Sequence, residues 1–381
     1  MHISQIKKSI SILSIMFIVL SYLLSSGILL FHPQRALAAT YTVTTNADSG
    51  AGSLRQAITD ANASVGVDDT IEFAIAGAGP HTISLSSALP LIIDPVIIDG
   101  TTQSGASCGT NFADRNLLIE VDSSRVGTDP TIRFDTGGDN STVKGLVING
   151  APPGNIAALN GVGSMTIQCN NVGTNIAGTA SAGTQGPGIT IIGGDNNQIG
   201  GTNAGEGNII SGGNDGIILS TDSDNNTMQG NWIGLGTDGS CIGNGNGQGI
   251  GIIGDDNMIG GITSAARNVI SCHSAVGLGS GIDIVGGFGA STTGNKIQGN
   301  YLGTNPSGQV QTGFGNNSGI NFVADAQDNL VGGTGVGEAN LIAGNSAGIA
   351  NVSYQSFESI NNSFVSNKIY DNSGGVLSSL G

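Results

Sequence analysis

The sequence contains few charges, few aromatic side chains and very few basic residues. Charged residues make up 10% of the 381 residues, and aromatic residues 4%. The 11 Lys and Arg stand against 27 Asp and Glu, which gives a formal net charge of -16 at pH 7. Nucleic acids and anionic membrane surfaces are therefore disfavoured as partners, because both attract basic surfaces. The carboxylates are scattered along the chain, which favours a role in solubility.

Long hydrophobic runs are absent apart from one at the N-terminus. Two lysines precede an apolar stretch from Ile10 to Phe31, and Ala36-Leu37-Ala38 follows it. A basic start, an apolar segment and a small-x-small site are typical of a secretory signal peptide. We predict that residues 1–38 are such a signal, that the mature chain starts near Ala39, and that it is secreted or held at the cell surface. Because the apolar stretch is long enough to span a bilayer, an uncleaved membrane anchor is the alternative.

Glycine, asparagine and isoleucine are abundant, and they recur in a fixed order. From Gly188 onward each unit reads Gly-Ile-x-apolar, then Asn-x-apolar, then Asn-x-apolar again. Because one such unit cannot bury its apolar face alone, the repeat predicts a solenoid of stacked units. We expect three short strands per coil, with the first strand of each coil at Ile132, Ile156, Ile189, Ile217, Ile250, Ile282, Ile320 and Ile349.

Two further apolar columns follow at steady offsets, one for each remaining strand. Alternation along a strand places these side chains in the interior. The second strand centres on Val143, Ile167, Ile199, Met228, Ile259, Ile297, Val331 and Phe364. The third centres on Ile148, Val172, Ile210, Ile233, Ile270, Leu302, Ile342 and Ile369.

Asparagines stand two residues before these apolar positions and form two columns. Asn tolerates the left-handed backbone of a corner, and its amide can hydrogen-bond the same amide one coil away, at a strand spacing of about 4.8 Å. The first column contains Asn197, Asn226, Asn257, Asn295, Asn329 and Asn362. The second contains Asn170, Asn208, Asn231, Asn268, Asn300, Asn340 and Asn367. At the third corner we expect glycines with positive φ, at Gly188, Gly216, Gly249, Gly281, Gly319 and Gly348.

Every other coil from Ile189 onward carries six additional residues between its second and third strands. The stretches read GGTNAGEGN, GGITSAARN and GGTGVGEAN. They predict a row of bulges on one corner, roughly 9.6 Å apart. Glu206 and Glu338 align within them, whereas Ala266 and Arg267 stand at that place in the middle loop. The alignment indicates a repeated decoration and not a catalytic site.

These GIxI, NxIGG and NxISG segments resemble secreted bacterial right-handed parallel β-helix repeat proteins, the pectate-lyase-like fold in the broad sense. The resemblance covers the chain from about Thr131 to the C-terminus. Residues Tyr41 to Asn62 and Pro95 to Gly105 are similar to the segment that precedes such helices in large bacterial surface proteins. The resemblance implies an all-β, right-handed parallel β-helix solenoid. It implies little about chemistry, because one fold hosts many functions.

The first and last coils of a solenoid need covers, because unpaired strands invite aggregation. Ser53 to Gln56 fits an S-x-x-Q capping box and starts an apolar helical face, which predicts a short capping helix. We therefore expect an N-terminal cap with irregular first coils over residues 39–130 and regular coils over residues 131–381. After Ile369 no comparable cover follows, so we expect a C-terminally truncated helix that is part of a larger surface protein. An end-to-end oligomer and a natural ragged terminus are the alternatives.

The four cysteines can pair in an exported chain, but their spacing alone does not assign partners. Cys241 and Cys272 both lie between a third strand and the next first strand in consecutive coils, so a disulfide between them is geometrically sensible. Cys108 and Cys169 are left over. Free thiols that act as small apolar filler are the expectation for this pair.

Catalysis is the main alternative to a structural role. Lyases of this fold class use Arg or Lys beside calcium-holding carboxylates, and hydrolases use neighbouring Asp residues. The basic residues of the coils share no column and adjoin no acidic cluster in the sequence; they are Arg133, Lys144, Arg267, Lys296 and Lys368. We therefore expect a non-catalytic structural or adhesin-like module. A polysaccharide lyase or glycoside hydrolase of the pectate-lyase-like class is the alternative.

Acidic residues recur at one corner. Asp255 and Asp256 form an acidic pair before Asn257, and Asp195 and Asp328 stand at matching positions two coils away on either side. Carboxylates roughly 9.6 Å apart do not share a proton, so turn formation is favoured over catalysis. We expect no cofactor; a row of weak calcium sites at these four aspartates is the alternative.

Two histidines, His81 and His273, are candidates for catalytic groups. His273 adjoins Cys272, but neighbouring side chains point apart and no orienting acid follows. His81 has no partner in the sequence either. Both are expected to be incidental surface histidines.

Two aromatic residues occupy the same register of the third strand. Trp232 and Tyr301 precede Ile233 and Leu302, so they point outward if the isoleucine and leucine point inward. They lie two coils apart with Val269 between them and are candidates for stacking on sugar rings. An extracellular polysaccharide or a cell-surface component is thus the expected partner, and an exposed aromatic ladder without a ligand is the alternative.

Overall fold

The computed structural model describes Met16 and residues 37–183, 185–245, 247–274, 279–287, 291–352 and 358–380. The predicted signal segment, residues 1–38, lies outside the described residues except for Met16, Leu37 and Ala38. Across the described residues, no helix has both the length and the apolar character needed to cross a membrane. The compact body of the protein comprises Ala38–Gly381.

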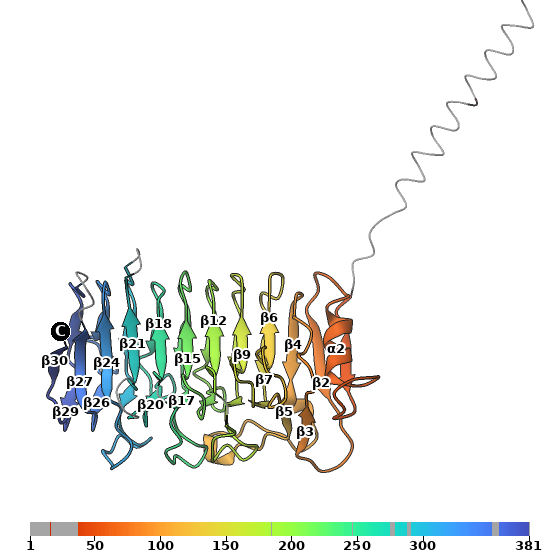
Figure 1. Ribbon diagram of the computed structural model, residues 1–381, viewed down its shortest axis with the longest axis horizontal. Helices are drawn as coiled ribbons and strands as arrows, with labels where there is room; N and C mark the ends of the chain where they lie inside the picture. Colours follow the sequence, from red (N-terminus) through yellow and green to blue (C-terminus); the bar gives the residue numbers. More distant parts are fainter. Residues whose placement is uncertain are drawn as a thin grey trace, which may run out of the picture. The chain divides into compact units, whose positions relative to one another are not determined.

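This body is a right-handed parallel β-helix with three strands in each regular coil, as the sequence predicts (Figure 1). Sheet A has 11 strands in spatial order: β1 (Thr40–Val43), β2 (Asp69–Phe73), β4 (Val96–Asp99), β7 (Thr142–Lys144), β10 (Thr166–Gln168), β13 (Gln198–Gly200), β16 (Thr227–Gln229), β19 (Met258–Gly260), β22 (Lys296–Gln298), β25 (Leu330–Gly332) and β28 (Ser363–Val365).

Sheet B has 10 strands: β3 (His81–Ser84), β5 (Ile119–Asp122), β8 (Val147–Asn149), β11 (Asn171–Val172), β14 (Ile209–Ile210), β17 (Trp232–Ile233), β20 (Val269–Ile270), β23 (Tyr301–Leu302), β26 (Leu341–Ala343) and β29 (Lys368–Tyr370). Sheet C has 9: β6 (Ile132–Phe134), β9 (Ile156–Ala158), β12 (Ile189–Ile191), β15 (Ile217–Leu219), β18 (Ile250–Ile252), β21 (Ile282–Val285), β24 (Ser318–Val323), β27 (Ala347–Val352) and β30 (Leu377–Leu380).

Like residues superimpose from one coil to the next. Ile217 pairs with Ile250, and Ile250 pairs with Ile282, and all three side chains are fully buried. The same holds in the other sheets, where Ile199 pairs with Met228 and Ile233 with Ile270. Each fully buried side chain of this size contributes about 1.5 to 3 kcal/mol. Stacked aliphatic columns therefore form one continuous core along the axis.

The N-terminal helix α2 (Leu54–Ala61) caps the first coil, as predicted. The Ser53 hydroxyl accepts the backbone N–H of Gln56, and the apolar face of the helix is buried. The reciprocal half of the capping box is absent, because the Gln56 side chain donates to Asp60 instead, at 2.7 Å. The strands that follow join sheets A and B, whereas sheet C begins only at β6.

The two predicted asparagine columns are present as hydrogen-bonded ladders. In the second column, Asn208 Nδ2 donates to Asn231 Oδ1, and Asn231 Nδ2 donates to Asn268 Oδ1, both at 3.0 Å. Each Oδ1 also accepts the backbone N–H of the asparagine one coil earlier. The first column has the same bonds, except that the Asn226 amide nitrogen donates to the Gly194 carbonyl and not to Asn257 Oδ1. The ladders thus satisfy buried backbone groups at two corners.

A third ladder occupies the third corner, where the sequence indicated only glycine. It contains Asn244, His273, Asn316, Asn345 and Asn372. His273 is fully buried, so the expectation of a surface histidine is wrong. Its Nδ1 lies 2.9 Å from Asn316 Oδ1, and its Nε2 lies 3.2 Å from Asn244 Nδ2. Because the amide oxygen only accepts and the amide nitrogen only donates, the ring is neutral with its proton on Nδ1.

The corner glycines serve close packing and not positive φ, which corrects the sequence expectation. None of the six has φ in the left-handed region. A Cβ on Gly281 would lie 2.6 Å from the Gly319 carbonyl oxygen and 3.1 Å from Asn316 Nδ2. The left-handed residues instead precede the first asparagine column, at Asn196, Asn225, Asp256, Asp328 and Asn361. Glycine is thus required at the third corner because a side chain has no room there.

Candidate functional site

A cavity of about 350 Å³ lies on the outer face of sheet B, beside the predicted row of inserted loops. Trp232 of β17 forms part of its wall, together with Phe112 and Arg115 from the segment around the short 3-10 helix η2 (Phe112–Asp114). The rest of the lining consists of Thr110, Asn111 and Gly230, of residues 201, 203–205 and 207 in the first inserted loop, and of residues 264, 265 and 267 in the second. Its described lining contains two arginines and no Asp or Glu.

The aromatic wall is built from residues far apart in the sequence. The ring centroids of Phe112 and Trp232 lie 4.4 Å apart, with an interplanar angle of 38°. Trp232 pairs with Val269, and Val269 pairs with Tyr301, so the outward column has the predicted register. Phe112 is a component that sequence reasoning missed, because it comes from the N-terminal cap and no repeat carries it.

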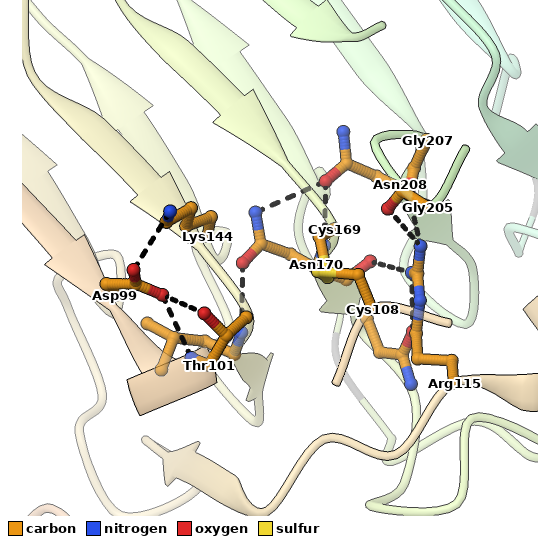
Figure 2. The surroundings of a disulfide bond; sticks show 12 residues. Asp99, Thr101, Cys108, Arg115, Lys144, Cys169, Asn170, Gly205, Gly207 and Asn208 are labelled. Carbon is orange, nitrogen blue, oxygen red and sulfur yellow. Dashed lines mark hydrogen bonds and ion pairs between the residues drawn. A yellow bond between two sulfur atoms is a disulfide. The ribbon is translucent and has the colours of Figure 1, made fainter. Parts of the chain in front are cut away.

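Arg115 ties the cap to the first inserted loop (Figure 2). Its Nη1 donates to the Asn170 carbonyl and to Asn171 Oδ1, both at 3.1 Å, and its Nη2 donates to the carbonyls of Gly205 and Gly207. Burial lowers the pKa of Arg115 to about 9, which leaves the guanidinium protonated at neutral pH. Its buried Nε has no hydrogen-bond partner among the described residues.

A disulfide between Cys108 and Cys169 holds the same segment against the coils, with the Cα atoms 5.6 Å apart (Figure 2). The expectation of free thiols at these positions is therefore wrong. This bond could not be predicted from the repeat, because Cys108 lies in the cap and Cys169 lies at a corner 61 residues later. The second disulfide joins Cys241 to Cys272, in agreement with the sequence expectation.

Arg267 is the second cation of the cavity wall. Its guanidinium lies over the ring of Tyr301, with the carbon Cζ 4.0 Å from the ring centroid. Its Nε donates to the Gly299 carbonyl at 3.2 Å. In contrast, Arg133 pairs with Asp129 and Lys144 pairs with Asp99. Within the described part of the chain Arg267 has no carboxylate partner, which leaves its terminal nitrogens for a ligand.

The aligned glutamates of the inserted loops hydrogen-bond groups within those loops. The carboxylate of Glu206 accepts the Asn203 N–H at 2.9 Å and the Asn203 side-chain amide at 2.7 Å. Glu338 accepts the Gly335 N–H at 2.6 Å. In the middle loop the Thr263 hydroxyl takes this role by accepting the Ala266 N–H.

The corner aspartates also cap backbone groups. Asp195 Oδ1 accepts the Asp224 N–H, and Asp224 Oδ1 accepts the Asp255 N–H, at 2.9 and 2.7 Å. The column therefore repeats every coil and includes Asp224, which corrects the expected spacing of two coils. Asp256 and Asp328 lie outside it, at left-handed positions with φ of 55° and 53°. Within the described residues, no three His, Cys, Asp or Glu side chains converge as a metal-binding group.

Sequence reasoning missed two carboxylates that interact, Asp283 on sheet C and Asp215, which lies two residues before β15. Asp283 lies on the outer face of β21 between Gly251 and Asn321, and it accepts hydrogen bonds from Ser280 and Asn321. Burial is the main reason that the pKa of Asp283 is raised to about 6; the hydrogen bonds from Ser280 and Asn321 oppose the shift, and the nearby charge of Asp215 adds to it. Burial also raises the pKa of Asp215. Their separation of more than 60 residues in the sequence hides the pair.

Comparisons with known proteins give one kind of match. No protein-family model and no curated protein sequence matches the chain. Among solved structures, the fold is similar to the catalytic unit of a thermostable GH87 alpha-1,3-glucanase from Streptomyces thermodiastaticus strain HF3-3. The identity is 15% over 89% of this chain and 70% of the glucanase chain, with a TM-score of 0.33.

Proposed function

We propose that this protein is a secreted or cell-surface β-helix module without catalytic activity, and that the cavity beside Trp232 binds an anionic saccharide. The cavity wall combines aromatic rings with guanidinium groups, and its described lining contains no carboxylate. This combination is the observation that carries the proposal.

The aromatic residues supply the apolar part of the site. A sugar ring presents a C–H face that packs on an aromatic ring, and sites of this kind join such a platform to a few polar groups. Trp232 and Phe112 form the platform, and Tyr301 lies behind Arg267. Because Phe112 and Trp232 contact each other, their orientation is fixed before a ligand arrives.

The cations supply the charge preference. A guanidinium binds a carboxylate or sulfate through two parallel hydrogen bonds. Stacking on Tyr301 orients Arg267 toward the cavity without neutralising it. Since the chain as a whole carries a net charge of -16, these two arginines form a local exception that favours an anionic ligand. Arg267 offers the hydrogen bonds, because the Nη groups of Arg115 already donate to protein oxygens.

Two observations support an extracellular location. The N-terminal segment has the pattern of a secretory signal. All four cysteines are joined in disulfides, which persist in oxidising compartments.

A binding measurement tests the proposal. The protein is titrated with a polyuronate and with a neutral glucan of similar length, and we expect binding of the polyuronate alone. Replacing Trp232 or Arg267 with Ala should weaken binding by about tenfold or more, whereas Arg125→Ala, at an exposed arginine outside the cavity, should leave it unchanged. Equal binding by all three variants would reject the cavity as the site.

A glycoside hydrolase is the second candidate, and Asp283 with Asp215 favours it. A buried carboxyl with a raised pKa beside a second carboxylate is the arrangement that general acid catalysis of glycoside cleavage requires. Release of reducing ends from any polysaccharide, abolished by Asp283→Asn but not by Asp139→Asn, would establish this activity. In that case the non-catalytic role would be rejected.

A further inference from the structure

The carboxylate of Asp69 is buried without a cation. Asp69 begins β2, and none of its surface is exposed. Its Oδ1 accepts the backbone N–H of Ala39 at 2.7 Å, and its Oδ2 accepts the Ser64 hydroxyl. Among the described residues, no Lys or Arg pairs with Asp69. The next buried acid, Asp94, accepts the Gly66 N–H and is also without a cation.

A buried carboxylate with only neutral donors is costly. Burial of an ionised group is tolerated when a positive charge and further hydrogen bonds compensate for the lost hydration. Asp69 has the hydrogen bonds but not the charge. The position of the missing charge is indicated by Ala39, whose backbone nitrogen donates to Oδ1 at 2.7 Å.

Ala39 directly follows Ala36-Leu37-Ala38, the small-x-small sequence of a signal cleavage site. The compact body begins at Ala38, and the side chains of Leu37 and Ala38 are exposed. Ala39 is held from the other side as well, because its carbonyl accepts the Thr70 N–H at 2.9 Å. The bond between Ala38 and Ala39 therefore lies at the boundary of the folded body.

We propose that an exported endopeptidase hydrolyses the Ala38–Ala39 peptide bond and that the new α-ammonium of Ala39 becomes the counter-ion of Asp69. Water adds across the bond, so Ala38 leaves with a carboxylate and Ala39 gains the ammonium. The ammonium occupies the position of the present N–H donor. Processing thus converts a hydrogen bond into a buried ion pair and fixes β1 at the edge of sheet A. The proposal is independent of ligand binding by the cavity.

The first experiment is N-terminal sequencing of the protein exported by a bacterial host. We expect the sequence to begin at Ala39. A start at any other residue, or retention of the signal, would overturn the proposal.

The second experiment measures the reactivity of the α-amine in the mature chain. The folded protein is treated with an acylating reagent at pH 7, and the modified N-terminal peptide is quantified by mass spectrometry, with the lysine peptides as internal references. Pairing with Asp69 keeps the amine protonated, so acylation should be at least about tenfold slower than in Asp69→Asn. The matched control is Asp68→Asn, at an exposed neighbouring carboxylate, which should react like the wild type.

A further measurement covers the case in which Asp69→Asn fails to fold. The rate of α-amine acylation in the wild-type protein is followed against pH, and its midpoint should lie above the ordinary range of about 7.7 to 8.0. A midpoint within that range would show that the amine does not pair with Asp69 and would reject the proposal.

Discussion

Nδ1 of His273 lies 2.9 Å from Oδ1 of Asn316, in the place that an asparagine amide takes elsewhere in the same ladder. The histidine ring thus continues a column of amides by using one nitrogen as donor and the other as acceptor. Protonation would place a second N–H on Nε2, opposite the Nδ2 group of Asn244. The ladder therefore requires a neutral ring.

The first prediction concerns acid stability. Burial lowers the pKa of His273 from its ordinary value of 6.5 to about 4, although the hydrogen bond to Asn316 opposes this shift. The unfolded chain then binds a proton at a higher pH than the folded protein. The neutral His273 ring therefore contributes its full stabilisation above pH 6.5. This contribution, roughly 3 kcal/mol in all, is lost as the pH falls toward 4.

The variant His273→Asn tests this dependence by removing the titrating group. Urea unfolding is measured at several pH values between 4 and 7, and the loss of stability on acidification should be smaller in the variant than in the wild type. His81→Asn, at a partly exposed histidine, is the control and should keep the wild-type slope. Parallel curves for wild type and His273→Asn would contradict the assignment of a neutral ring.

The second prediction concerns the asparagine ladders. Asn257 Nδ2 donates to Asn295 Oδ1 and to the Ser223 carbonyl, and its Oδ1 accepts the Asn226 N–H. Asn257→Ala leaves these buried groups unpaired, so we expect a loss of about 2 to 4 kcal/mol in the free energy of unfolding. The exposed Asn214 is the control, and its replacement by Ala should cost less than about 0.5 kcal/mol.

Asn225 is a less suitable control, although it lies just outside the column. Its φ is 57°, so Ala at this position carries a backbone cost of its own, about 1 kcal/mol. We expect Asn225→Ala to fall between the other two variants in denaturant unfolding. Equal losses for Asn257→Ala and Asn214→Ala would show that the ladder does not stabilise the corner.

The regular part of the fold could be predicted from the sequence because each coil repeats the same physical problem. An isoleucine at position 217, 250 or 282 has the same neighbours, so periodicity alone gives its partner. The third ladder could not be predicted from the sequence, because loops of different lengths separate its members from the corner glycines. Asn244 stands five residues before Gly249, whereas Asn316 stands three before Gly319.

Only the residues of the candidate site that lie within the repeated coils could be predicted from the sequence. Trp232 and Tyr301 share a register within the repeat, so their outward column follows from the sequence. Phe112 and Arg115 belong to the cap, and their contacts with Trp232 and the loop 201–207 depend on a chain path that no periodicity encodes. The Cys108–Cys169 bond was missed for the same reason.

The third prediction tests the role of glycine at the third corner. A Cβ on Gly281 would lie 2.6 Å from the Gly319 carbonyl oxygen, and backbone atoms cannot move aside as a flexible side chain can. Gly281→Ala should therefore destabilise the protein by roughly 1 to 3 kcal/mol in denaturant unfolding. Gly127 has no atom within 4 Å of such a Cβ and no left-handed φ, so Gly127→Ala should be neutral or slightly stabilising. The same loss at both positions would contradict the packing role.

The fourth prediction separates the two disulfides. Replacing Cys108 and Cys169 with Ala should lower the free energy of unfolding by about 2 to 4 kcal/mol and release the segment that carries Phe112 and Arg115. Cleavage of this segment by trypsin, and loss of polyuronate binding, would report its release. The matched variant replaces Cys241 and Cys272, whose bond lies away from the cavity lining. It should lose stability but keep the binding affinity, and loss of binding in both variants would indicate a general effect of unfolding.

The fifth prediction concerns Asp283, whose pH dependence has the opposite sign from that of His273. Burial raises the pKa of Asp283 from 3.8 to about 6, so the folded protein holds a proton that the unfolded chain has already lost. The stabilisation that the protonated Asp283 carboxyl contributes is complete below pH 3.8 and is lost as the pH rises through 6. Asp283→Asn keeps a neutral side chain at every pH and should therefore be more stable than the wild type at pH 7, with the difference vanishing near pH 4.

If the protein has a hydrolytic activity, the same variant should abolish this activity while its stability increases. Loss of activity with a gain in stability is expected for a catalytic carboxyl that is held in an unfavourable, buried position. A variant that is less stable than the wild type at pH 7 would instead show that the ionised carboxylate is stabilised by its neighbours, and the raised pKa would be wrong.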